Sequence, residues 1–154
     1  MRCKPLTKES DVSRIENIAV IAHDNRKRDM LAWIVRHHAR LTGATLMATG
    51  TTGRLIEEET GLSVERYASG PLGGDQQIGA RIAEGKVDML IFFWDPLEPL
   101  PHDPDVKALL RLATLWNLPT ATNEATADML LTSPMFDDYV PNRPDFGSYT
   151  ERKI

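Results

Sequence analysis

The chain has 154 residues, of which 42% are hydrophobic and 26% charged, and this is the size and composition of one ordinary soluble domain. Lys and Arg number 18 against 22 Asp and Glu, so the net charge of -4 provides no basic field for nucleic acid or for an anionic membrane. Its single cysteine, Cys3, excludes an intrachain disulfide framework and fits a reducing, cytoplasmic setting, and no apolar run approaches the roughly 20 residues of a transmembrane helix.

Short apolar runs alternate with amphipathic stretches along most of the chain. The apolar runs predict strands at residues 18–22, 45–48, 63–68, 87–94 and 120–122. The amphipathic stretches predict helices at residues 27–40, 52–60, 75–84, 105–116 and 124–131. Because strands and helices alternate, the sequence predicts an α/β fold: a single doubly wound, Rossmann-like domain with a five-stranded parallel sheet and helices on both faces.

Three segments are expected along the chain. Residues 1–16 are a polar N-terminal arm without the features of a signal peptide. Residues 17–132 form the α/β domain. Residues 133–154 are a tail rich in Pro and Asp, expected to pack on the domain or on a neighbouring subunit.

Unusual polar residues follow the predicted strands at their carboxyl ends. In open α/β sheets ligands bind at this edge, because loops and helix N-termini converge there. The opposite edge carries mainly glycine and ordinary turn residues. The polar residues at the carboxyl edge are His23, Asp24, Thr49, Thr51, Thr52, Ser69, Asp75, Asp95, His102, Asp103, Asp105, Thr122 and Asn123.

The segment from Thr49 to Gly53 combines hydroxyls and glycines at the start of a predicted helix. Unpaired backbone N–H groups and the helix dipole favour an anion there, so a phosphate is expected. Ser69 and Gly70 could add a hydroxyl and an N–H, and Lys27 a positive charge. The competing interpretation is that Thr51 or Thr52 only caps the helix. The segment is neither a Walker loop nor a dinucleotide fingerprint, which disfavours ATP and NAD.

Two histidines, His23 and His102, end up on the same edge with several acids nearby. They suit acid/base chemistry or a metal, but the spacings typical of metal ligands are missing, so no metal is expected. Asp75 follows two glycines at a helix start, where it could be only the N-cap. The glycines also allow a ligand to approach, and a carboxylate and a histidine beside a phosphate suggest proton abstraction next to a carbonyl.

Four segments closely resemble the methylglyoxal synthase family, in order and at the family's spacing. They are residues 22–24 (AHD), 48–53 (ATGTTG), 69–79 (SGPLGGDQQIG) and 91–111 (IFFWDPLEPLPHDPDVKALLR). The resemblance implies a lyase without cofactors that converts dihydroxyacetone phosphate to methylglyoxal and inorganic phosphate through an enediolate phosphate. It also implies a homohexamer in the bacterial cytoplasm, with phosphate as product and inhibitor.

The resemblance assigns roles to residues of this chain. Asp75 matches the carboxylate that removes a carbon-bound proton, and His102 the histidine that acts as electrophile and proton relay. Asp24 and Asp105 match supporting acids, and Arg152 a terminal basic residue linked to subunit contacts and to inhibition by phosphate. The set that binds substrate and phosphate is His23, Lys27, Thr49, Gly50, Thr51, Thr52, Ser69 and Gly70.

The chain departs from the family's pattern at two places. The tail differs through residues 140–149, and Asn25 and Arg26 replace the residues expected before Lys27. The second change is expected to alter the charge near the pocket more than the chemistry. A regulatory phosphate- or nucleotide-binding domain of the same fold is the alternative function, and an isomerase or aldolase-like enzyme acting on the same triose phosphate is a weaker one.

Overall fold

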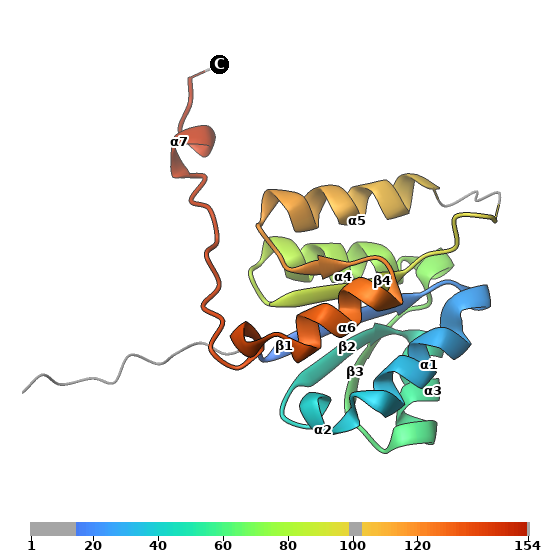
Figure 1. The fold of residues 1–154 in the computed structure, drawn as a ribbon. Coiled ribbons are helices and arrows are strands. Elements are labelled where there is room, and N and C mark those ends of the chain that lie inside the picture. Colours follow the sequence, from blue (N-terminus) through green and yellow to red (C-terminus); the bar gives the residue numbers. More distant parts are fainter. Residues whose placement is uncertain (1–14, 99–102, 154) are drawn as a thin grey trace, which may run out of the picture.

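A five-stranded, all-parallel sheet forms the centre of the protein in the computed structural model, which describes residues 15–98 and 103–153 (Figure 1). The strands are β1 (Asn17–Ala22), β2 (Thr45–Thr49), β3 (Val64–Tyr67), β4 (Met89–Phe93) and β5 (Thr120–Ala121), in the order β3-β2-β1-β4-β5. The helices are α1 (Lys27–Arg36), α2 (His38–Leu41), α3 (Gly50–Thr60), α4 (Gly74–Ala83), α5 (Asp103–Leu115), α6 (Glu124–Thr132) and α7 (Gly147–Thr150). Three 3-10 turns are η1 (Asp24–Arg26), η2 (Gly70–Leu72) and η3 (Pro134–Phe136). The predicted fold class is confirmed.

Both faces of the sheet are covered, as the continuous apolar runs predict. Along β1, Ile18 and Val20 belong to a core shared with α1, α3 and α6, whereas Ala19 and Ile21 belong to a core shared with α4 and α5. Successive side chains of a strand point to opposite faces, so an uninterrupted apolar strand serves two helical layers at once. Figure 1 shows α4 and α5 on one side of the sheet and α1, α3 and α6 on the other.

The strand order reverses at β1. The chain goes from β1 to β2 and β3 on one side, and then returns to place β4 and β5 on the other. Ala22 pairs with Phe93 at the ends of β1 and β4, and the backbone N–H of His23 continues the ladder to the Phe93 carbonyl at 3.1 Å. Ligands of doubly wound folds bind outside the strand ends at such a reversal, which here lies between His23 and the loop after β4.

One predicted helix is divided in two. The helix expected over residues 27–40 is broken at His37, whose backbone leaves the helical region at φ -102° and ψ 16°. The break lets the His37 ring pack against Trp33 and place Nε2 2.6 Å from an Asp128 carboxylate oxygen on α6. This long-range contact with α6 is not visible in a local hydrophobic pattern.

The C-terminal segment contacts the domain at the amino end of the sheet before it projects away from it. Arg143 donates to the buried carboxylate of Asp88 at 2.8 Å, and the Phe146 ring packs edge-on against Trp116. Beyond this point α7 extends away from the sheet (Figure 1). Within residues 15–98 and 103–153, no helix has the length and apolarity needed to cross a membrane.

Candidate active site

A cavity of about 380 Å³ opens at the carboxyl edge of the sheet. It lies where the ends of β1, β2 and β3 meet the start of α4, and it brings together most of the predicted site residues. Its lining consists of Ile21, Ala22, His23, Asp24, Lys27, Thr49, Thr51, Ser69, Gly70, Pro71, Asp75 and Glu98. The edge that the sequence selects is therefore the edge that is hollowed.

One side of the cavity is formed by the start of α3. Thr49 is the N-cap residue, in an extended conformation, and its side chain makes no capping bond. The first-turn N–H groups of an α-helix lack intrahelical partners, so this end suits an anion. A Cβ on Gly50 would lie 3.1 Å from the Tyr67 carbonyl oxygen, so the glycine allows α3 to begin close against the end of β3. The expectation that Thr51 or Thr52 caps the helix is wrong, because the cap position belongs to Thr49.

Thr52 and Gly50 do not line the cavity, although both belong to the predicted phosphate set. The Thr52 side chain lies in the first turn of α3 and is 2% exposed. Its hydroxyl oxygen has no hydrogen-bond partner among the residues that the structure describes. A buried hydroxyl without a partner costs free energy, so a ligand oxygen that reached it would relieve that cost.

Lys27 brings a positive charge to the same cavity. Its side chain is only 17% exposed, and Nζ contacts the Ala22 carbonyl oxygen at 3.3 Å and an Asp24 carboxylate oxygen at 2.5 Å. The hydrogen bond from Lys27 lowers the pKa of the Asp24 carboxyl below its ordinary value. Asp24 thus acts on the cavity through the position of the ammonium group.

Asp75 lies in the first turn of α4 and is 9% exposed. The N-cap of α4 is Gly73, at φ 101°, so the expectation that Asp75 could be the N-cap is wrong. A Cβ on Gly74 would lie 1.9 Å from the Ala68 carbonyl oxygen, and one on Gly70 would lie 3.4 Å from both carboxylate oxygens of Asp75. The glycines therefore let backbone segments close around this carboxylate.

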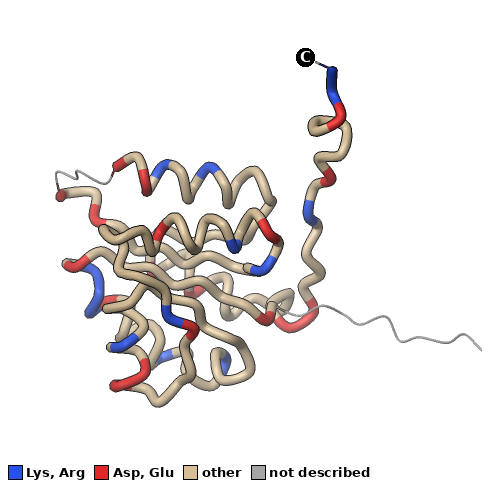
Figure 2. Tube along the Cα trace, turned by 180° about the vertical axis from the view of Figure 1, so that it is seen from behind, with Lys and Arg blue, Asp and Glu red and all other residues tan. Residues whose placement is uncertain are grey.

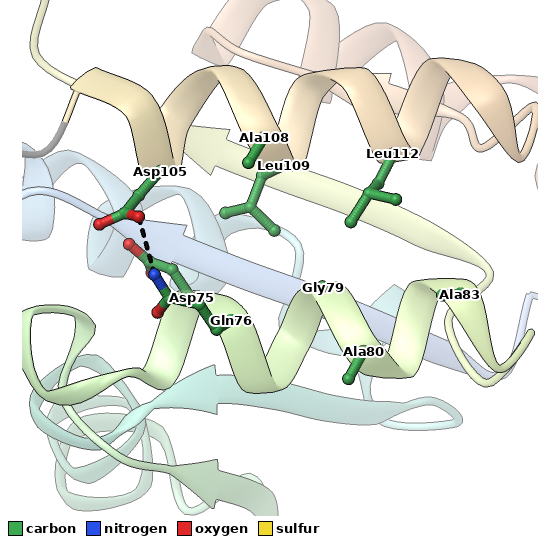
Figure 3. Close-up of a pocket in the computed structure, with 9 residues that line it drawn as sticks. All are labelled: Asp75, Gln76, Gly79, Ala80, Ala83, Asp105, Ala108, Leu109 and Leu112. Carbon is green, nitrogen blue, oxygen red and sulfur yellow. Dashed lines mark hydrogen bonds between the residues drawn. The ribbon is translucent and has the colours of Figure 1, made fainter.

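Asp105 faces Asp75 from the neighbouring helix. Asp75 and Gln76 on α4 and Asp105 on α5 extend toward one another near the starts of the two helices (Figure 3). Gln76 Nε2 donates to a carboxylate oxygen of Asp105 at 2.7 Å, at one end of a second cavity of about 270 Å³ between α4 and α5. Gln76 is absent from the predicted site, although its place directly after Asp75 in a helix start could have drawn attention to it.

His23 lines the cavity at the end of β1, with its ring edge-on to Phe92 at 5.4 Å between centroids. Its Nδ1 accepts a hydrogen bond from the backbone N–H of Asp95 at 3.0 Å. Burial lowers the pKa of the His23 imidazole below its ordinary value, against the opposing effect of the Asp75 carboxylate. The ring is thus a neutral imidazole with its hydrogen on Nε2.

Charges of both signs gather at this edge. Acidic residues at the end of β4 and the start of α5 lie on the same side of the molecule as the basic start of α1 (Figure 2). Glu98, in the loop after β4, also lines the cavity. The sequence offers no sign of this role beyond the residue's place in a loop at the ligand edge.

The cavity lining does not account for two further predicted site residues. His102 lies outside the described residues. Arg152 follows α7, far along the projecting tail, where its guanidinium stacks 4.0 Å from the centre of the Tyr149 ring. Within the described part of the chain, no three His, Cys, Asp or Glu residues are grouped so as to hold a metal ion.

Comparison with known proteins places these residues in a family. A family model described as "MGS-like domain" matches residues 29–122. The methylglyoxal synthase of Hahella chejuensis is 62% identical over 140 residues, which cover 91% of this chain and 92% of that protein. That of Cellvibrio japonicus is 56% identical over 147 residues, covering 95% and 96%. The crystal structure of methylglyoxal synthase from Elizabethkingia anophelis superposes with a TM-score of 0.83 at 51% identity, covering 90% of this chain and 92% of that one.

Proposed function

This chain belongs to the methylglyoxal synthase family, and from that premise we propose that it converts dihydroxyacetone phosphate to methylglyoxal and inorganic phosphate. The observation that carries the proposal is the position of Asp75. Its carboxylate is nearly buried, and it shares one cavity with a neutral histidine and with the start of α3. A base, a hydrogen-bond donor and an anion site in one cavity are what enolisation of a phosphorylated ketone requires.

The phosphate group binds at the start of α3 in this proposal. Donors and positive charge at the cavity come from the hydroxyls of Thr49, Thr51 and Ser69, from the Lys27 ammonium, and from the first-turn N–H groups of α3 other than that of Gly50, which donates to the Ala68 carbonyl at 3.3 Å. Gly50 lets α3 begin close against the end of β3, and Gly70 lets the cavity wall lie close to the Asp75 carboxylate. The buried Thr52 hydroxyl, just behind the lining, is expected to donate to a phosphate oxygen that reaches the first turn of α3. Binding at this end directs the three-carbon chain toward Asp75.

Proton abstraction begins the reaction. The Asp75 carboxylate takes a proton from the hydroxymethyl carbon of the substrate, and the electron pair moves into the carbonyl to give an enediolate. The Nε2–H of His23 donates to the oxygen on which negative charge develops, as His102 does by its match to the family. Asp24 and Asp105 support the site by holding Lys27 and by facing Asp75.

Loss of phosphate completes the reaction. The proton of the carbon-1 hydroxyl first passes to the oxygen on carbon 2. The electrons of the double bond then move to carbons 2 and 3 as the bond between carbon 3 and oxygen breaks and inorganic phosphate leaves. The remaining enol takes up a proton at carbon 3 and loses its hydroxyl proton to give methylglyoxal. Expulsion requires the breaking bond to stand perpendicular to the plane of the enediolate. An isomerase acting on the same substrate would instead hold that bond in the plane and keep the phosphate.

The first experiment follows two products at once. Metal-free protein is incubated with dihydroxyacetone phosphate, and inorganic phosphate and the dicarbonyl are measured together with no added nucleotide. We expect equal amounts of both, and in Asp75→Asn a rate at least about 100-fold lower with phosphate binding retained, because loss of a general base costs this much or more.

Three other outcomes would contradict the proposal. Glyceraldehyde 3-phosphate as product would indicate the isomerase. Phosphate binding without turnover would indicate the regulatory domain. Full activity in Asp75→Asn would remove Asp75 as the base. Asp138→Asn, at an exposed position beyond η3, is the matched control for the change of charge and should be fully active.

We also propose that the protein works in the cytoplasm as a homohexamer, with the tail of residues 133–154 packed against a neighbouring subunit and inorganic phosphate acting as product and inhibitor. The direction in which α7 leaves its own sheet supports contact with another chain (Figure 1). Arg152, two residues beyond α7, is then placed to take part in that contact.

A further inference from the structure

A short chain of hydrogen bonds links Asn25 to the His23 ring across the end of the sheet. Asn25 Nδ2 donates to Asp95 Oδ2 at 3.0 Å, and the backbone N–H of Asp95 donates to His23 Nδ1 at 3.0 Å. The other carboxylate oxygen, Oδ1, accepts from the backbone N–H of Leu97 at 2.9 Å. The chain joins η1, which follows β1, to the loop that follows β4, at the point where the strand order reverses.

The chemistry of these groups leaves one arrangement of hydrogens. A backbone N–H is only a donor, so Nδ1 of His23 must be the acceptor and the ring hydrogen of the neutral imidazole must be on Nε2. An ionised carboxylate is only an acceptor, so the amide nitrogen of Asn25 must face Asp95. The amide of Asn25 also lowers the pKa of the Asp95 carboxyl, which keeps that carboxylate ionised.

We propose that Asn25 is a positioning residue: by holding the Asp95 carboxylate, it keeps the Asp95 backbone N–H on Nδ1 of His23 and so fixes the cavity-lining ring as the Nε2–H tautomer. Without the Asn25 amide, the Asp95 carboxylate loses its bond to η1 and keeps, among the described hydrogen bonds, the one from the Leu97 N–H in its own loop. The N–H then drifts from Nδ1, and the ring can take up hydrogen on either nitrogen. Only the Nε2–H form keeps its donor available for a bound ligand.

Several charged groups act on the same ring. Asp75 of α4, with Asp95 and Glu98 after β4, favours the protonated imidazole, whereas Lys27 of α1 and burial favour the neutral one. The Asp95 N–H opposes protonation of Nδ1 directly, because an atom that accepts a hydrogen bond cannot also carry a proton. Loss of this N–H, or a further carboxylate beside Asp95, therefore raises the pH at which His23 becomes charged.

The test replaces the amide by a carboxylate of the same shape. Asn25→Asp places two carboxylates together and removes the donor, while the double variant Asn25→Asp with Asp95→Asn reverses the pair and restores one amide–carboxylate bond. In the double variant the side-chain oxygen of residue 95 can still accept from the Leu97 N–H. Asn142→Asp is the matched control for charge, at an exposed position where the backbone carbonyl is the group bonded to Asn117.

The main readout is the nitrogen NMR spectrum of the His23 ring, assigned by its loss in His23→Gln. The wild type, the double variant and the control should show Nε2 protonated and Nδ1 bare at neutral pH. Asn25→Asp should show exchange between the two tautomers and a proton taken up at higher pH. Asn25→Ala, which removes the donor without adding charge, should shift the spectrum in the same direction by less.

Kinetics provide the second readout and rest on the proposed function. In Asn25→Asp, kcat/KM should fall about tenfold and its acid limb should move to higher pH, since loss of a group that orients a site residue typically has effects of this size. The double variant should recover both. A His23 spectrum unchanged in Asn25→Asp, or still altered in a folded double variant, would overturn the proposal. Because the NMR spectrum reports the His23 tautomer directly, it tests the role of Asn25 even if the wild type has no lyase activity.

Discussion

The hydrogen bonding of the Thr52 hydroxyl indicates a role in ligand binding and not in stabilising the fold. The half-buried hydroxyl of Thr60, at the other end of α3, serves the fold: it donates to the Ile56 carbonyl at 2.6 Å and accepts from the Leu62 N–H at 3.2 Å. The Thr52 hydroxyl has no such partner among the described residues. A buried hydroxyl without a hydrogen bond destabilises the ligand-free protein, and a ligand oxygen that bonds to it would remove that cost.

We therefore expect opposite effects from the same substitution at the two threonines. Thr52→Val keeps the shape of the side chain, so the free energy of unfolding should stay within about 0.5 kcal/mol or rise, while the affinity for inorganic phosphate falls about tenfold. Thermal unfolding and calorimetric titration with phosphate measure the two effects.

Thr60→Val is the matched control. It should lose about 1 kcal/mol of stability and keep its phosphate affinity, because it breaks hydrogen bonds within the fold at the far end of the same helix. A loss of stability in Thr52→Val with unchanged phosphate affinity would show that the Thr52 hydroxyl serves the fold instead.

The start of α4 decides where the candidate base lies. The predicted helix at residues 75–84 and the observed α4 nearly coincide, so local periodicity is sufficient to find the element. Its depth against the sheet depends on Gly74, where a Cβ would lie 1.9 Å from the Ala68 carbonyl oxygen and 3.0 Å from Thr49 Cγ2. The first contact is with backbone, which cannot rotate away as a flexible side chain would.

Gly74→Ala should therefore push the start of α4 away from β3. We expect a loss of about 3 kcal/mol in the free energy of unfolding, in the range of severe steric changes, and a large fall in turnover because Asp75 moves with the helix. Denaturant unfolding and the assay of both products are the measurements. Gly43→Ala, where a Cβ meets nothing within 4 Å, should change stability by no more than about 0.5 kcal/mol. Equal stability of the two variants would contradict the steric argument.

At the scale of the whole molecule, the tail is bound to the edge of the sheet opposite the cavity. Asp88 accepts from the backbone N–H groups of Glu16 at 3.1 Å and Asn17 at 2.9 Å, as well as from Arg143. Arg143 also donates to the Val87 carbonyl oxygen at 3.1 Å. One carboxylate thus joins the start of β1, the approach to β4 and the C-terminal segment.

Arg143→Met should release the tail and leave the site intact. We expect faster protease cleavage within residues 137–153, a loss of about 1 kcal/mol of stability and unchanged chemistry in the isolated subunit, because Asp88 keeps its backbone donors. Lys107→Met is the control for loss of an exposed cation, since Lys107 pairs with Asp103 within α5 and not with the tail. Unchanged proteolysis in Arg143→Met would contradict the anchoring role.

The same variant bears on the proposed hexamer. Sedimentation of the wild type should give the mass of six 17.2 kDa chains, and release of the tail should shift it toward smaller particles. A wild-type monomer would contradict the hexamer, and an unchanged mass after release of the tail would contradict its place in the subunit contact.

The sequence by itself determined the alternation of strands and helices, the parallel sheet and the edge of the sheet at which the cavity opens. These follow from local patterns: the apolar run of β1 requires cover on both faces, and glycines and hydroxyls at strand ends mark helix starts that can accept an anion. Within the motif from residue 69 to 79, two glycines before a helix start directed attention to Asp75. The comparison with known proteins confirms the family that this motif resembles.

Only the tertiary structure decided which side chains touch. The break at His37 depends on Asp128, 91 positions away, and the tautomer of His23 depends on Asp95, 72 positions away. From the sequence, Asn25 was expected only to alter the charge near the pocket. Its hydrogen bond to Asp95 depends on the pairing of β1 with β4, which brings the two loops together. Contacts of this kind are set by how the sheet is assembled, which no pattern within one segment encodes.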